Sequence, residues 1–271
     1  MQRRISLAVV GLTAALGAAL AAGSASAASC SNTSSGFEAW KADFARQASA
    51  AGVGQRGLEA LSNTRYSQST ISADRNQKSF RYSLDKFMEI RGSATIVRQG
   101  RDRKARNANF YASLERAYGV PAGVLIAIHG METGFGRFMG DSEVVSAITT
   151  LAFDCRRSEF FKPHALGALK LVDRGSITRQ TRGAKHGELG HTQFLPGNAL
   201  RYGVDGNGDG RVDFYNETDA LASTANFLRQ KGWRPGQGYQ QGQPNFRVIE
   251  AWNAATVYQQ AIAIMARQID G

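Results

Sequence analysis

The chain of 271 residues has few cysteines and only one long apolar run, at its N-terminal end. After Ala22 no apolar stretch is long enough to span a membrane, so we expect no transmembrane segment in the mature protein. The sequence also lacks a G-x-S-x-G nucleophile elbow, so nothing local points to a serine hydrolase. No internal repeat is visible, which argues against a repeat architecture.

The N-terminal segment has the pattern of a secretory signal peptide. Two arginines precede an apolar, Gly- and Ala-rich stretch over residues 5–22, and small residues up to Ala27 fit a cleavage site. We therefore expect residues 1–27 to be removed and the protein to lie in the periplasm. The Ala-Ala-Ser that precedes Cys30 lacks the large aliphatic residue of a lipobox, so we expect no lipid anchor.

The two cysteines, Cys30 and Cys155, both remain after such a cleavage. A secreted chain folds in an oxidising compartment, where thiol pairs form disulfides. The simplest expectation is therefore one disulfide that ties the N-terminal segment to the middle of the chain.

The charge balance is strongly basic. Against 22 acidic residues the chain has 33 lysines and arginines, which gives a formal net charge of +11. Outside the cytoplasm such a protein is attracted to anionic cell-wall polymers or membrane surfaces. The densest basic run, residues 98–106, is typical of a solvated helix face. It has no interleaved aromatic residues for base stacking, so we expect no nucleic-acid partner.

Apolar residues recur with a helical period over most of the chain after Gly36. The pattern predicts a mainly α fold in which any sheet is small and confined to loops. We place an N-terminal helical region at residues 28–115, packed on a core at 116–271. The helices that we expect most clearly cover residues 37–51, 95–118, 143–153, 157–172 and 251–269.

Glu132 has the most informative local context. Val124, Ile128 and Glu132 recur every four residues, so they share one face of a helix. A carboxyl at the end of an apolar face loses hydration, which favours its protonated form and suits a general acid. Gly134 and Gly136 then permit a tight turn that leaves the carboxyl facing a cleft. The spacing alone equally allows a helix-terminal glutamate that points to solvent.

Residues 132–136, Glu-Thr-Gly-Phe-Gly, resemble a motif of the lytic murein transglycosylases of the B type. The resemblance continues at 150–161, at 187–196 and around 252–258, and it covers roughly the C-terminal two-thirds of the chain. It implies a lysozyme-like core of the goose-type and soluble-lytic-transglycosylase kind. It also implies cleavage of the MurNAc-β-1,4-GlcNAc bond in peptidoglycan glycan strands, with formation of a 1,6-anhydro-MurNAc end.

The same resemblance assigns roles to individual residues. Glu132 corresponds to the catalytic acid and base, and Gln193 to a glutamine that contacts the saccharide. Two further assignments have plainer interpretations that stay open, because Phe194 also suits a core position and Tyr258 a half-buried position on a helix. The full set of expected substrate-binding residues is Gln193, Phe194, His191, Asn253 and Tyr258.

Three positions depart from the family pattern. Ala184 stands where the family usually has serine, so one hydrogen bond near the catalytic carboxyl is expected to be absent. Glu188 stands where a small residue is usual, and His191 where glutamine or tyrosine is more frequent. The acid itself is unchanged, so these departures bear on subsite preference and pH dependence.

Two other functions remain open on the sequence. A hydrolytic muramidase would cleave the same bond with a second carboxylate or an activated water. Asp154 and Glu143 are candidates for that carboxylate only through proximity in the sequence. A peptidoglycan-binding module without turnover is the other alternative, suggested by Ala184 and His191.

Residues 205–213 resemble the start of an EF-hand calcium loop, since oxygen-bearing side chains alternate and glycine occupies the sixth position. Asn216 stands at the twelfth position, where glutamate is usual, and the family resemblance closes the loop with a later acid. The alternative is an Asx- and Gly-rich turn without metal. The expected ligands of a structural Ca²⁺ are Asp205, Asn207, Asp209, Arg211 through its backbone carbonyl, and Asp219.

Overall fold

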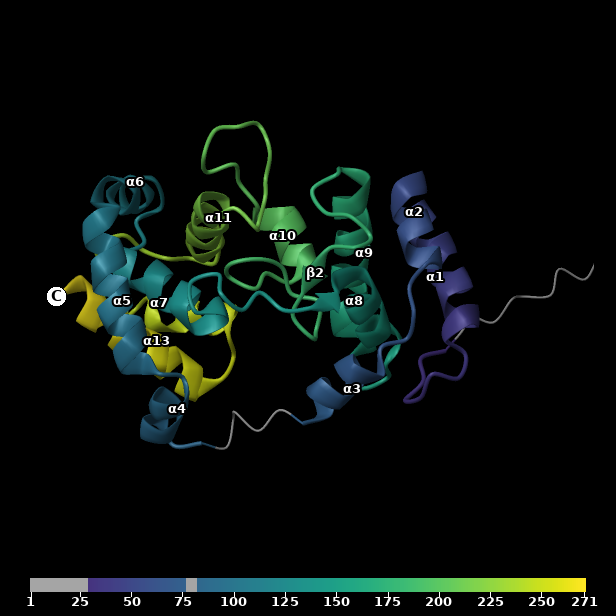
Figure 1. Cartoon of the computed structure of the whole chain (residues 1–271), viewed down its shortest axis with the longest axis horizontal. Helices are drawn as coiled ribbons and strands as arrows, with labels where there is room; N and C mark the ends of the chain where they lie inside the picture. Colours follow the sequence, from purple (N-terminus) through teal and green to yellow (C-terminus); the bar gives the residue numbers. More distant parts are fainter. Residues whose placement is uncertain (1–28, 77–81) are drawn as a thin grey trace, which may run out of the picture.

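The computed structural model describes residues 29–76 and 82–271. The expected signal peptide at 1–27 lies outside the described residues. Within the described part of the chain the fold is mostly helical, as the sequence predicted (Figure 1). None of the described helices combines the length and the apolar character that a membrane crossing requires.

The connections between the helices are short up to α9 and longer on either side of α10 and after α11. The first group comprises α1 (Phe37–Ala50), α2 (Gln55–Ser62), α3 (Gln68–Arg75), α4 (Leu84–Ile90), α5 (Ser93–Arg106) and α6 (Ala108–Tyr118). The second comprises α7 (Ala122–Thr133), α8 (Val144–Phe153), α9 (Ser158–Asp173), α10 (Pro196–Tyr202), α11 (Glu217–Gln230), α12 (Phe246–Trp252) and α13 (Thr256–Asp270). Strands β1 (Ser142–Glu143) and β2 (Arg182–Gly183) form a two-stranded antiparallel sheet.

The N-terminal helices pack on the rest of the molecule in two separate places. Helices α1, α2 and α3 lie beside α8 and α9, whereas α4 and α5 lie beside α7 and α13 (Figure 1). Helix α6 contacts α11. The domain boundary that we placed between residues 115 and 116 falls within α6, so it does not coincide with a break between helices.

Two of the expected helices are divided. The segment 95–118 is interrupted at Asn107, where α5, packed on α13, gives way to α6, packed on α11. The segment 251–269 is interrupted at 253–255, because the Asn253 Oδ1 accepts the backbone N–H of Ala255 (3.0 Å) and forms a local turn. Apolar periodicity continues across both breaks, and for that reason it did not reveal them.

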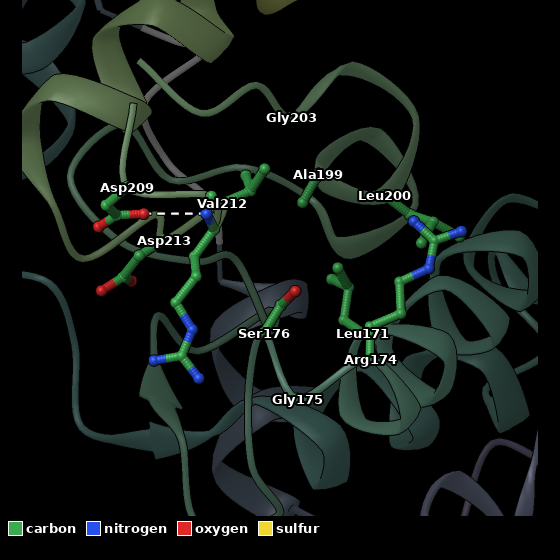
Figure 2. A pocket seen from close by; sticks show the side chains of 12 residues that line it. Leu171, Arg174, Gly175, Ser176, Ala199, Leu200, Gly203, Asp209, Val212 and Asp213 are labelled. Atoms are coloured by element: carbon green, nitrogen blue, oxygen red, sulfur yellow. Dashed lines mark hydrogen bonds between the residues drawn. The ribbon is translucent and has the colours of Figure 1, made fainter. Parts of the chain in front are cut away.

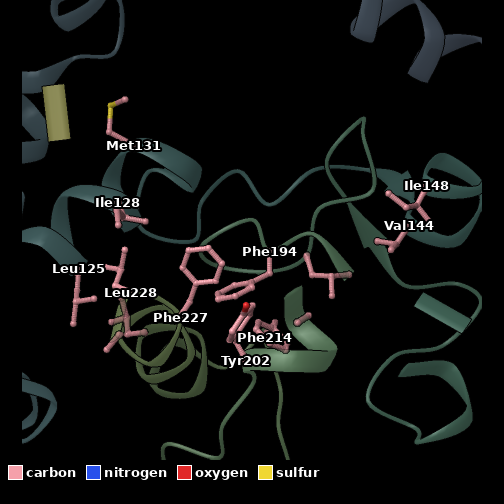
Figure 3. Close-up of a cluster of buried hydrophobic side chains, with 14 of the residues drawn as sticks. Leu125, Ile128, Met131, Val144, Ile148, Phe194, Tyr202, Phe214, Phe227 and Leu228 are labelled. Carbon is pink, nitrogen blue, oxygen red and sulfur yellow. The ribbon is translucent and has the colours of Figure 1, made fainter. Parts of the chain in front are cut away.

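Helix α7 is enclosed by helices α5, α6, α11 and α13. Its residues are buried on every side from Ala122 to Met131, and Leu125 and Ile128 belong to the cluster of apolar side chains in Figure 3. A helix that is apolar all round is a core helix. The sequence predicted a single apolar face, so more of the helix surface is buried than expected. This packing holds the end of the helix that carries Glu132.

The expected disulfide between Cys30 and Cys155 is present. Cys155 follows α8, so the bond fixes the segment before α1 to the α8–α9 connection. An isolated bridge between Ser31 and Asp154 lies next to it.

Candidate active site

Glu132 is the penultimate residue of α7, and the chain turns sharply after it. Gly134, Phe135 and Gly136 all have positive φ, at 57°, 65° and 84°. Positive φ is strained for phenylalanine, and such strain is held only where the surroundings fix it. The Thr133 hydroxyl accepts the backbone N–H of Gly136 (2.8 Å) and closes the turn. The chain therefore leaves the helix at once and does not cover the carboxyl, as the two glycines predicted.

Two donors hold one oxygen of the Glu132 carboxyl. The Tyr258 hydroxyl of α13 donates to Oε1 at 2.5 Å, and the Trp252 Nε1–H of α12 donates to the same oxygen at 3.0 Å. No described residue donates to Oε2, so that oxygen is the one available to a ligand. The alternative in which Glu132 points to bulk solvent is therefore wrong.

Burial raises the pKa of Glu132 above its ordinary value. The hydrogen bonds from Tyr258 and Trp252 and the charge of Arg91 act in the opposite direction, because they stabilise the carboxylate. Burial is the largest of these effects. The carboxyl therefore keeps its proton to higher pH than a solvated glutamate, which is what a general acid requires.

The free side of Glu132 faces a cavity of about 620 Å³, which is within the usual size range of ligand sites. Gln193, Phe194 and Asn253 line the same cavity, so the structure brings three of the expected substrate-binding residues to the acid. Ala184 also lines it, and its methyl group offers no hydrogen bond. The cations in the cavity wall are Arg91, Arg157 and Lys185.

Gln193 has a left-handed backbone, with φ of 54°, which is uncommon for a residue other than glycine. Its Nε2 donates to the Gly190 carbonyl at 2.7 Å and more weakly to the Met139 carbonyl at 3.4 Å. No described residue donates to its Oε1. The protein thus orients the amide from one side and leaves the carbonyl oxygen as an acceptor for a sugar hydroxyl or amide.

Phe194 and Tyr258 support the acid from behind. Phe194 is 2% exposed, and its ring packs edge-on against Trp252 with the centroids 5.2 Å apart. It also contacts Phe214 and Phe227 (Figure 3). The Phe194 side chain is therefore part of the core, as the second interpretation proposed. Its ring holds the Trp252 donor in place. Tyr258 is 4% exposed and acts on Glu132 rather than on the cavity.

The structure does not bring His191 into the cavity wall. Its Nδ1 lies 2.9 Å from the Nε2 of His129, one turn before Glu132 on α7. Gln193, two residues later, does line the cavity. The turn between them points the side chains of His191 and Gln193 in different directions, which the sequence could not show. The Oε1 of Glu217 lies 3.9 Å from the His129 Nδ1 and completes a group that could hold a metal ion. Arg103 already pairs with Glu217 at 2.9 Å, so the acid of this group has a cation partner.

The candidates for a second catalytic carboxyl were wrong, because neither lines the cavity. Asp154 is buried and pairs with Arg75 at 2.7 Å, and Glu143 accepts a hydrogen bond from Ser146 at 3.1 Å. The second carboxyl in the cavity wall is Glu188. Its only signal in the sequence was its departure from the small residue that is usual in the family.

The calcium-like loop lies away from this cavity. The Asp205 carboxylate accepts the backbone N–H groups of Gly208 (2.6 Å) and Gly210 (2.7 Å), and Gly210 has φ of 85°. Asp209 accepts the backbone N–H of Arg211 at 2.9 Å beside a separate cavity of about 520 Å³ (Figure 2). No catalytic candidate lines that second cavity.

Asp219 closes the loop from the first turn of α11. It is fully buried, and its two oxygens accept backbone N–H groups of Gly206 and Asp213, both at 2.9 Å. Asn216 caps the same helix by accepting the N–H of Thr218 at 2.9 Å. The structure therefore gives Asn216 a capping role, while Asp219 contacts the loop through its carboxylate.

Comparisons with known proteins identify the family to which the chain belongs. Residues 36–243 match the family model described as Transglycosylase SLT domain. Over 123 residues the chain is 34% identical to the membrane-bound lytic murein transglycosylase B of Escherichia coli strain K12. That match spans 45% of this chain and about a third (34%) of the length of that relative.

Solved structures are similar over most of the chain. SltB3 of Pseudomonas aeruginosa, in complex with NAG-anhNAM-pentapeptide, has a TM-score of 0.78 and 28% identity, and the match covers 87% of this chain and 80% of that one. A second SltB3 structure, with NAG-NAM-pentapeptide, has a TM-score of 0.79 at the same identity and coverage. Slt35 of Escherichia coli, in complex with calcium, has a TM-score of 0.73 over 84% of this chain and 92% of that one; its 21% identity shows a shared fold alone.

Proposed function

Because the chain belongs to the Transglycosylase SLT domain family, we propose that it is a lytic murein transglycosylase. In this proposal it cleaves the MurNAc-β-1,4-GlcNAc bond of peptidoglycan and leaves a 1,6-anhydro-MurNAc end. The observation that carries the proposal is the Glu132 carboxyl: one oxygen is held by Tyr258 and Trp252, and the other side faces a cavity of glycan size.

The reaction needs one group that is first an acid and then a base. Protonated Glu132 gives its proton to the glycosidic oxygen as the bond to C1 of the muramoyl ring breaks. The resulting carboxylate then takes the proton of the muramoyl C6 hydroxyl, whose oxygen bonds to C1 and closes the anhydro ring. Tyr258 and Trp252 stabilise the carboxylate between the two steps, because both donate to Oε1.

The substrate class is supported by the relatives and by the charge of the cavity. SltB3, which is 28% identical, has been solved with muropeptide ligands. In this chain Arg91, Arg157 and Lys185 line the cavity. Peptide stems of peptidoglycan carry carboxylates, which such cations attract.

The alternatives differ in their products. A muramidase would leave reducing ends, and Glu188 is the one feature that favours it, because it adds a second carboxyl to the cavity. A binding module without turnover would leave peptidoglycan intact. Mass spectrometry of the material released from purified peptidoglycan separates the three, since anhydro products are lighter than hydrolysis products by one water. Release of anhydro muropeptides is the result that we expect.

The cellular location follows from the same proposal. Peptidoglycan lies outside the cytoplasmic membrane, so we propose that the mature protein acts in the periplasm after removal of residues 1–27. The curated relative in Escherichia coli is named as membrane-bound. For this chain the segment before Cys30 lacks a lipobox, and we propose an enzyme without a lipid anchor.

We also propose that the loop at 205–219 binds a structural Ca²⁺. Carboxylate and amide oxygens of Asp205, Asn207, Asp209 and Asp219 are a suitable donor set, and Arg211 would add its backbone carbonyl. The three carboxylates of this set, Asp205, Asp209 and Asp219, form no ion pair with a lysine or arginine in the described part of the chain. A bound Ca²⁺ would neutralise their charge and hold the loop on α11, with no part in the reaction.

Calcium is therefore expected to raise the melting temperature of the protein, because a ligand that binds the folded state alone stabilises it by mass action. Thermal unfolding with millimolar calcium should occur at higher temperature than unfolding with a chelator. Asp209→Ala should abolish the difference. Asp141→Ala, which removes an exposed acid elsewhere, is the matched control and should keep it. Identical curves for the wild type under both conditions would contradict the proposal.

A further inference from the structure

Glu188 places a second carboxyl beside the catalytic cavity in a fixed position. It ends the turn that follows β2, in which the Ala184 N–H donates to the Glu188 carbonyl (3.1 Å) and the Gly187 N–H donates to the Ala184 carbonyl (3.0 Å). Gly187 has φ of 85°, and a Cβ there would lie 2.9 Å from Ile148. Only glycine fits this position, which restricts the backbone of the turn that carries Glu188.

The Glu188 carboxyl is poorly compensated for its burial. Its side chain is 23% exposed, and its direct hydrogen bond comes from the His186 backbone N–H to Oε2 at 3.2 Å. The His186 Nδ1 lies 3.6 Å from Oε1. No described lysine or arginine forms an ion pair with it, although a carboxylate can accept about four hydrogen bonds. Burial raises the pKa of Glu188 to about 7, and the negative charge of Glu132 acts in the same direction. The backbone N–H groups of Glu188 and His186 and the charge of Arg157 act in the opposite direction and are outweighed.

The cations around the cavity do not cancel this effect. Arg157, before α9, is held by the Asp74 carboxylate at 2.5 Å, and its charge lowers the pKa of Glu188 by less than burial raises it. Arg91, after α4, acts on Glu132. Lys185 and His186 belong to the same turn as Glu188, and Lys185 pairs with Asp141 at 2.8 Å. Burial therefore outweighs the neighbouring charges and donors at both Glu132 and Glu188, and the pKa of each carboxyl is raised.

We propose that Glu188 is a positioning residue that shares one proton with Glu132 across the cavity and so keeps Glu132 able to act as an acid at neutral pH. This inference rests on the proposed function. Two carboxyls in one poorly hydrated site do not ionise independently, so the pair loses its two protons in two separate steps. Between those steps one proton remains on the pair, and it is available to Glu132 over a wider pH range than a lone carboxyl would allow.

In this chain a carboxyl group takes the place of a hydroxyl group near the catalytic acid. Ala184 removes a hydroxyl near the catalytic carboxyl, and Glu188, four residues later in the same turn, adds a titrating group. Both side chains line the cavity. A hydroxyl donor would favour the ionised form of a nearby acid, whereas a second carboxyl favours its protonated form.

Glu188→Gln tests the proposal, because it keeps the shape of the side chain and an acceptor for the His186 N–H but removes the charge. We expect the alkaline limb of kcat/KM against pH to move to lower pH by about one unit, with about tenfold lower activity on that limb. On the acidic side activity should stay close to wild type. Glu159→Gln, an exposed change on α9, is the matched control and should leave the profile unchanged.

Infrared spectroscopy of the enzyme without substrate tests the shared proton independently of the reaction. The infrared carbonyl band of protonated carboxyls should persist to higher pH in the wild type than in Glu188→Gln. An unchanged pH profile and an unchanged band in a folded variant would overturn the proposal. A uniform loss of kcat at every pH would also overturn it, since Glu188 would then contact the substrate directly. Reducing-end products from the wild type would reject the proposed function, while the band would still decide whether the proton is shared.

Discussion

Glu132→Gln is expected to lower turnover of peptidoglycan by at least about a thousandfold while binding of peptidoglycan survives. The amide keeps the size of the side chain but cannot give a proton to the glycosidic oxygen or recover one. Gln193, Asn253 and the cations of the cavity wall are unchanged, so the variant should still sediment with purified peptidoglycan. Release of soluble muropeptides measures turnover, and co-sedimentation measures binding.

The fold of the Glu132→Gln variant provides an internal check. Burial raises the pKa of this carboxyl in the folded state, so its contribution to stability is present at acidic pH and is lost as pH rises through the raised pKa. At neutral pH the amide avoids that loss, and the variant should melt at or above the wild-type temperature. Glu143→Gln makes the same change outside the cavity and should retain turnover. Substantial turnover by the Glu132→Gln variant would show that Glu132 is not the catalytic acid.

Cys30→Ser is expected to destabilise the fold by about 2 to 4 kcal/mol, because the disulfide to Cys155 closes a long loop and restricts the unfolded chain. Denaturant-induced unfolding of the variant and of the wild type measures the difference. The serine variant should expose one reactive thiol, and reduced wild type should match its stability.

Substitution of the other cysteine, and of both cysteines together, provides the controls for this prediction. Cys155→Ser should cost as much as Cys30→Ser, and the double variant should cost no more than either, since all three remove the same bond. Two reactive thiols in the unreduced native protein would show that the bond is absent.

The parts of the site that the sequence predicted are those set by local patterns. Glu132 follows from an apolar helix and a glycine turn, and both lie within a few residues of it. The placement of Gln193 and Asn253 came from the family resemblance, which transfers positions that periodicity cannot show. A core position for Phe194 was one of the two interpretations that the sequence left open, but its contact with Trp252 was not predicted.

The parts that the sequence did not predict depend on contacts between distant segments. His191 and Gln193 lie two residues apart, but only the turn geometry shows that His191 pairs with His129 behind the cavity. Asp154 lies within the family segment 150–161, but its carboxylate pairs with Arg75 and does not reach the cavity. Glu188 reaches the cavity because the turn after β2 folds toward α7, and no local pattern encodes that approach.

The central claim is that Glu132 acts with the C6 hydroxyl of the substrate and not with water. Digestion of purified peptidoglycan in water enriched in heavy oxygen tests this most directly, because hydrolysis must place a solvent oxygen at C1 of the product. We predict that the released muropeptides contain no heavy oxygen and are lighter by one water than hydrolysis products. Heavy oxygen at a new reducing end would contradict the account and would identify the enzyme as a muramidase.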